Sequence, residues 1–235
     1  MNPRRLDTAR IFENLVAVYR LQFTLLAPAA LLVFAPVAAL NAVIKPEEVE
    51  QVFIMLVVNL LASYLLQGMA VEAVRDLQDG RRDFTIPGLF GSVVPVLGSL
   101  ILAGLVVTIA TGLGLALLIV PGLILLTIWA VVAPVIVIER LPALHALGRS
   151  RELVRGYGWP VFSVIAVVFL MQLIATQLLA IVLDGVDATI GAVVAVLVQG
   201  ALVAPVSAIA ATLIYLELNA GRPDAPVARA ADADA

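Results

Sequence analysis

Three closely spaced arginines and two aromatic residues form the group of side chains best suited to ligand binding. Arg149, Arg151 and Arg155 are followed by Tyr157 and Trp159, where a long apolar stretch begins. Clustered guanidinium groups attract anionic phosphates, and amphipathic aromatic rings favour the level of lipid headgroups. The group therefore predicts contact with anionic phospholipid headgroups. The alternative is that the arginines only fix the orientation of the chain in a membrane.

Neutral polar side chains inside apolar stretches form a second group. Its members are Asn59, Ser63 and Gln67, which recur every four residues, and the cluster Gln172, Thr176 and Gln177. A four-residue spacing places the first three on one face of a helix. Such side chains can line a polar pathway for a solute, although in membranes they more commonly bond across helix interfaces. Ion-coupled carriers usually also place an ionisable residue at mid-membrane, and none falls there in this sequence.

The sequence contains no arrangement typical of a catalytic or metal site. His145 is the single histidine, cysteine is absent, and no phosphate-binding, zinc-protease or nucleophile-elbow motif occurs. Glu72 and Asp76 lie in a charge-balanced segment that also contains Arg75. We therefore expect no catalytic residue, metal or cofactor, and the net charge of −3 predicts no nucleic-acid partner.

The chain that positions these residues is too apolar for a water-soluble domain. Of its 235 residues 63% are apolar and 13% charged, and its mean hydropathy is +1.11. Runs of about twenty residues without charge predict six membrane-spanning helices, near residues 21–44, 51–71, 92–116, 118–138, 159–183 and 189–216. We expect an all-α membrane protein, a six-helix bundle. The first run is longer and later than the apolar core of a signal peptide, so a first membrane helix is favoured.

The turn between the third and fourth runs is the least certain boundary. The uncharged stretch Ser92–Ile138 is 47 residues long, which suits two crossings. Residues 113–122 would form either a short hairpin or a re-entrant segment.

Basic residues orient the six helices. With six spans, all thirteen arginines fall on one side of the membrane and only Lys45 falls on the other. Because cytoplasmic loops are enriched in Lys and Arg, both termini are expected in the cytoplasm and the protein in the cell (inner) membrane.

Three charged stretches each precede a pair of spans, which suggests up to three repeated units of amphipathic interfacial helix plus hairpin. They are Leu6–Arg20, Arg81–Phe90 and Leu141–Gly156. In the third stretch Leu144, Leu147 and Val154 are expected to share an apolar face. The predicted domains are an amphipathic segment at 1–20, a membrane domain at 21–219 and a disordered tail at 220–235.

One long segment resembles a known family. Its motif positions are Pro121, Gly122, Pro134, Glu139 and Ser150, with Arg149 beside Ser150. This pattern is similar to the membrane domain of glycerophosphoryl diester phosphodiesterase membrane-domain proteins and related bacterial inner-membrane proteins of unknown function. The resemblance implies a six-helix membrane module. The family's soluble phosphodiesterase domain has no counterpart in this sequence, and Arg151 stands where the family usually has an aromatic residue.

The sequence thus favours a non-enzymatic module that contacts membrane phospholipids, acting as a lipid-interacting or scaffold protein. A transporter or permease for a lipid-like or small neutral solute is the alternative, and a membrane-embedded lipid enzyme ranks third. A protein partner or a homo-oligomer remains open.

Overall fold

The computed structural model describes residues 8–44, 48–78 and 85–220. Within these ranges every element is helical, and six helical segments are long and apolar enough to cross a membrane. They are α1 (Thr8–Val43), α2 (Val49–Gln78), α3 (Ile86–Leu117), α4 (Ile119–Ile128) with α5 (Val132–Glu139), α7 (Gly158–Val182), and α8 (Ala188–Val198) with the π-helical η1 (Gln199–Val203) and α9 (Ala204–Asn219). The short helix α6 (Ala143–Val154) joins α5 to α7. The expected all-α, six-span fold is confirmed.

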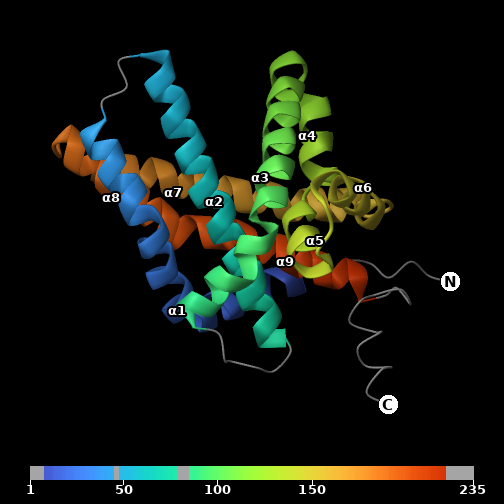
Figure 1. Cartoon of the computed structure of the whole chain (residues 1–235). Coiled ribbons are helices and arrows are strands. Elements are labelled where there is room, and N and C mark those ends of the chain that lie inside the picture. The colour runs from blue at the N-terminus through green and yellow to red at the C-terminus, as the bar shows by residue number, and fades with distance from the viewer. Residues whose placement is uncertain (1–7, 45–47, 79–84, 221–235) are drawn as a thin grey trace.

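Successive spans pack against one another. α1 packs against α2, α8 and α9, and α2 packs against α3 and α9. Figure 1 shows α2 and the α3–α4 hairpin rising through the view while α7 and α9 cross it. We call the end where α1 begins, α2 ends and α6 lies the basic end, because Arg10, Arg75, Arg140 and Arg149 all lie there.

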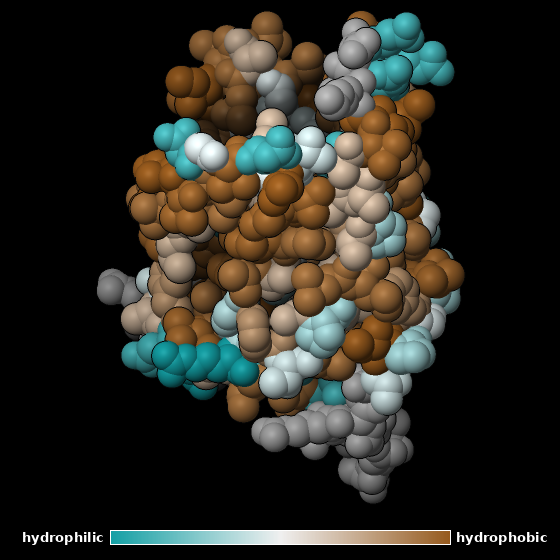
Figure 2. Space-filling model, turned by 90° about the vertical axis from the view of Figure 1, so that its left-hand side faces the viewer, coloured by the Kyte–Doolittle hydropathy of each residue, from teal (hydrophilic) through white to brown (hydrophobic). Residues whose placement is uncertain are grey.

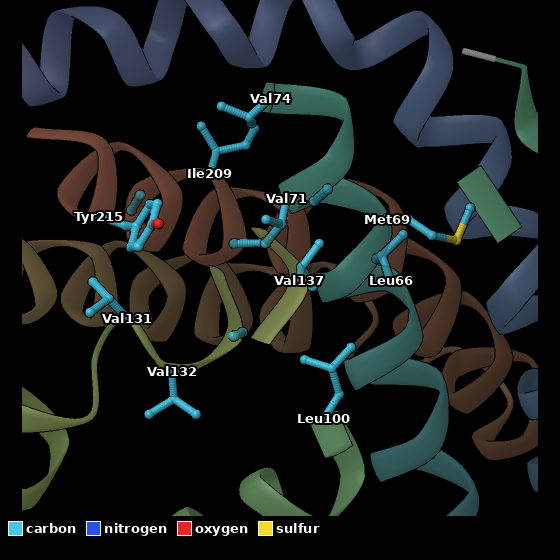
Figure 3. Close-up of a cluster of buried hydrophobic side chains, with 14 of the residues drawn as sticks. Leu66, Met69, Val71, Val74, Leu100, Val131, Val132, Val137, Ile209 and Tyr215 are labelled. Carbon is cyan, nitrogen blue, oxygen red and sulfur yellow. The ribbon is translucent and has the colours of Figure 1, made fainter. Parts of the chain in front are cut away.

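The core lies where α2, α3, α5 and α9 meet. Leu66 and Met69 of α2, Leu100 of α3 and Ile209 of α9 are almost completely buried. Figure 3 shows these side chains in one cluster with Val132 and Val137 of α5 and Tyr215 of α9. By contrast, most of α7 is exposed, including Phe169. Figure 2 shows one face that is mainly hydrophobic, with hydrophilic groups gathered toward its upper and lower parts. An apolar surface of this kind suits a lipid solvent.

The helix α1 continues through residue 20, the expected boundary between the amphipathic segment and the membrane domain. α1 runs from Thr8 to Val43 without a break, because no helix-breaking residue separates the charged stretch from the apolar run and Ile11 and Leu15 already pack into the core. Residues 1–7 of the predicted amphipathic segment lie outside the described residues.

The three predicted interfacial stretches therefore differ in structure. The first is the start of α1, and residues 86–90 of the second are the first turns of α3. Residues 81–84 lie outside the described residues. Only the third stretch forms a separate helix, α6. Ala220 follows α9 directly, and the rest of the predicted disordered tail, 221–235, is also outside the described residues.

Residues 113–122 form a direct hairpin. α3 continues to Leu117, only the extended Leu118 separates it from α4, and the Leu118 N–H donates to the Gly114 carbonyl at 3.0 Å. A Cβ on Gly114 would lie 3.0 Å from Gly122 Cα, so the absence of side chains at both positions allows the two helices to approach closely.

Candidate functional site

The fourth span breaks near its middle, and the break positions α6. Pro134 has no N–H to donate to the Ala130 carbonyl, and its ring would collide with that carbonyl in a regular helix. The chain accordingly leaves the α-helix between α4 and α5, where the Val132 N–H donates to the Trp129 carbonyl at 3.3 Å. In a regular helix the Ile128 carbonyl would accept a hydrogen bond from the Val132 N–H. Here it accepts one from Ser150 Oγ at 2.8 Å instead. Ser150 is fully buried on α6, so its hydroxyl ties α6 to the break.

A second contact holds the other end of the turn. Arg149 Nε lies 3.1 and 3.3 Å from the two carboxylate oxygens of Glu139, at the end of α5. The Tyr215 hydroxyl of α9 donates to Glu139 Oε1 at 3.0 Å, and it accepts a hydrogen bond from Asn219 Nδ2 at 3.2 Å. The side chains of Glu139 and Arg149 are 10% and 22% exposed. The mostly buried Glu139 carboxylate thus accepts hydrogen bonds from side chains of both α6 and α9.

A third contact fixes α5 to α2 and α3. Arg140 has a φ of 55°, the left-handed conformation that ends α5, which costs a residue other than glycine about 1–2 kcal/mol. In this position its guanidinium donates to Glu72 Oε1 at 2.6 Å and to the Ser92 carbonyl at 2.7 Å. Glu72 is 2% exposed and also lies 3.7 Å from Arg75. The charge-assisted bonds offset the backbone cost.

These contacts separate the five residues predicted to meet lipid headgroups into two classes. Arg149 forms an ion pair with Glu139, so its charge is used in a contact within the protein. Arg151 and Arg155 are exposed, Tyr157 is half-buried, and Trp159 is 81% exposed. The structure therefore leaves two arginines and an exposed tryptophan on the outer side of this turn.

The face that α6 buries differs from the predicted one. Leu147 and Val154 are buried as expected, together with Ala143, Ala146, Ser150 and Leu153. Leu144, in contrast, is 69% exposed. The buried face packs against α3, α4, α5 and α9. Leu144 thus shares the outer surface with Arg151 and Arg155, a stripe spaced at seven and eleven residues along one helix face.

The neutral polar stripes lie on separate helices: the stripe on α2 bonds within its own helix, whereas the cluster on α7 also bonds to η1. Asn59 donates to the Met55 carbonyl of its own helix, and Ser63 donates to the Asn59 carbonyl. Thr176 donates to the Gln172 carbonyl and accepts from Gln199 at 2.6 Å.

Two of the predicted polar residues sit in more distinctive places. Gln172 Nε2 reaches the Val203 carbonyl in η1 at 3.4 Å, next to Leu202, whose carbonyl accepts from the Tyr19 hydroxyl at 3.1 Å. Gln67 lines a cavity of about 150 Å³ between α2, α3 and α5, together with Tyr64 and Trp129. Asn59, Gln172 and Gln177 do not line that cavity, so the two stripes do not form one pathway there.

The structure places all five positions on which the family resemblance rests. Pro121 and Gly122 lie in the first turn of α4, and a Cβ on Gly122 would collide with Leu115 of α3. Pro134 breaks the span, Ser150 caps the break, and Glu139 binds Arg149. The motif positions therefore lie around one turn, where Gly122, Pro134 and Ser150 are buried, Glu139 is mostly buried and Pro121 is exposed.

Sequence reasoning missed the partners of these residues. Tyr215, Asn219 and Arg140 carry no local signal, because each meets its partner only through the packing of distant helices. One feature of the sequence could have indicated these contacts: Glu72 and Glu139 stand where the second and fourth apolar runs end, and each is largely buried and paired with a more exposed arginine. Among the described residues, no cluster of three His, Asp or Glu side chains could hold a metal ion.

No protein-family model, curated protein or solved structure matches this chain. The fold by itself defines the class: this is an all-α, multi-pass membrane protein with six apolar helical spans in the described part of the chain.

Proposed function

We propose that this multi-pass protein binds anionic phospholipid at its basic end and acts as a lipid-interacting or scaffold module of the inner membrane. The observation that carries the proposal is the exposed pair Arg151 and Arg155 beside Trp159. Glu139 neutralises their neighbour Arg149, whereas neither Arg151 nor Arg155 forms an ion pair within the described ranges. Two exposed guanidinium groups and an interfacial indole match a phosphate at the headgroup level.

The distribution of charge supports a cytoplasmic position for the basic end. All thirteen arginines of the chain fall on this side of the six-span topology, against Lys45 alone on the other. The cytoplasmic leaflet carries anionic lipid, so orientation and ligand agree. In this orientation both termini are cytoplasmic.

Copurification of lipid with single-charge variants tests the proposal. Arg155→Gln is expected to lower the anionic lipid retained through purification by about fivefold, because one surface charge contributes about 1 kcal/mol. Arg20→Gln is the matched control, since Arg20 is also exposed and also on the arginine-rich side, but lies on α1. Mass spectrometry of the extracted lipid gives the readout. Equal retention in both variants and the parent would contradict a specific headgroup site.

We further propose that the chain is a membrane module of the kind found in glycerophosphoryl diester phosphodiesterase membrane-domain proteins. Support comes from the motif positions, which build one coherent turn between α4 and α6. Purified protein that hydrolysed a glycerophosphodiester would contradict the non-enzymatic reading.

Transport of a small neutral or lipid-like solute is a second candidate function. It is favoured by the cavity of about 150 Å³ in which Gln67 and Tyr64 face the break between α4 and α5. Solute or lipid flux into protein-containing liposomes, above that of empty liposomes, would support transport. A flux lost in Gln67→Leu would place the path through this cavity.

A further inference from the structure

A groove opens on the apolar surface between α4 and the first turn of α7. Its volume is about 430 Å³, and its walls include Leu123, Ile124 and Ile128 of α4 and Gly158, Trp159 and Phe162 of α7. The rings of Trp159 and Phe162 meet edge to face, with centroids 5.7 Å apart and planes at 80°. These two rings form an aromatic wall on one side of the groove.

The groove is suited to hydrocarbon. The one side-chain hydroxyl on its wall belongs to Thr127, and that hydroxyl donates to the Leu123 carbonyl at 2.7 Å. Besides the Trp159 indole N–H, a peptide or a polar solute placed there would find little to pair with its own polar groups, and unpaired polar groups are costly away from water. An alkyl chain gives up no hydrogen bond in such a place and gains contact with the aromatic wall.

One end of the groove meets the proposed headgroup site. Gly158 follows Arg155 by three residues, so the two Cα atoms are at most about 11 Å apart. Trp159 belongs to both features: it lines the groove and is 81% exposed beside the arginines. A single ligand with an anionic head and a long apolar chain therefore matches the surface.

We propose that the α4–α7 groove binds one acyl chain of the anionic phospholipid whose headgroup contacts Arg151 and Arg155. This inference rests on the proposed function and adds to it a defined seat for the chain. It implies that one lipid stays bound at this position and does not exchange freely with the other lipids around the protein.

Trp159 can report on the chain directly. The protein has two tryptophans, and Trp129→Phe leaves Trp159 as the only one. The variant is placed in bilayer nanodiscs of zwitterionic phosphatidylcholine that contain a small fraction of phosphatidylglycerol brominated on an acyl chain. Bromine quenches indole fluorescence on contact. Quenching is expected to exceed that given by the same fraction of brominated phosphatidylcholine, with an apparent enrichment of roughly fivefold per arginine.

Filling the groove tests the seat itself. Gly158→Leu adds a side chain where no atom lies within 4 Å of the Cβ position, and Gly98→Leu on α3 makes the same change at an equally open site away from the groove. The excess quenching should disappear in Gly158→Leu and persist in Gly98→Leu. Ile124→Phe fills the groove from α4, without altering the neighbour of Trp159, and should act like Gly158→Leu. Ile109→Phe, at a similarly exposed position on α3, is its control.

The outcomes separate the two proposals. Excess quenching that survives both groove-filling variants overturns the groove and leaves the headgroup site standing. Absence of any excess for the anionic lipid also overturns the groove, and the effect of Arg155→Gln on copurified lipid then decides whether the headgroup site stands. The excess quenching should also disappear when Arg151 and Arg155 are both replaced by Gln. If this double variant and the groove-filling variants all remove it, the headgroup and the acyl chain belong to one bound lipid.

Discussion

Replacing Arg149 by methionine tests whether the contact between Arg149 and Glu139 holds the basic end together. Methionine keeps most of the apolar stem and removes the charge. Glu139, 10% exposed, would then keep only the Tyr215 hydroxyl at 3.0 Å as a partner. Removing one partner of a buried ion pair costs about 3–5 kcal/mol, and the 22% exposure of Arg149 reduces this to about 2–4 kcal/mol of unfolding free energy.

The reverse substitution has a smaller expected cost. Glu139→Gln retains an acceptor for the Tyr215 hydroxyl and leaves Arg149 partly exposed, 3.8 Å from Glu152. We expect a loss of about 1–2 kcal/mol. In the double variant the loss of unfolding free energy should be about 1–2 kcal/mol smaller than the sum of the two single losses. The second substitution then leaves no charged partner buried without its counterion.

Reversible unfolding in mixed micelles, driven by increasing dodecyl sulfate and followed by circular dichroism, measures these free energies. Arg151→Met is the control, since it removes the same charge from an exposed position on the same helix and should change stability by less than about 0.5 kcal/mol. Additive single losses, within about 0.3–0.5 kcal/mol, would show that Arg149 and Glu139 do not stabilise each other and would refute this account of the turn.

Two further stability predictions use the same unfolding assay. Ser150→Ala should cost about 1–3 kcal/mol, since the partly buried carbonyl of Ile128 loses its donor at the helix break; an unchanged free energy would mean that another group replaces it. Gly104→Ala should destabilise the protein by about 1–3 kcal/mol because its Cβ would collide with the ring of Tyr64, whereas Gly98→Ala, where the space is open, should have no cost and gain up to about 1 kcal/mol of helix propensity. Similar values for both glycines would contradict the close packing of α2 and α3.

The relation between sequence and structure is clearest in the fourth span. Pro134 is visible in the sequence and predicts a lost backbone bond, because that loss is a property of the residue itself. The identity of the group that compensates, Ser150 on the next helix, depends on how α6 folds back over the break. The same limit applies to Glu139: its place at the end of a span was readable, but its partners on α6 and α9 were not.

The site prediction divides in the same way. The arginines near residues 149–155 were recognised as a group, but sequence spacing could not show that one of them turns inward. That outcome depends on which face α6 buries, and the predicted apolar face wrongly included Leu144, which is exposed.

The sequence by itself determined the solvent of this protein, the number of its spans and their alternating direction, because these depend on the length of apolar runs and on which segments carry arginine. Only the tertiary structure decided that Arg149 neutralises Glu139 while Arg151 and Arg155 stay exposed, and that a groove lies beside them. The physical reason is that apolar burial in lipid requires only enough hydrophobic residues in a row, whereas ion pairs and grooves need particular atoms from helices far apart in the chain to meet within a few ångströms.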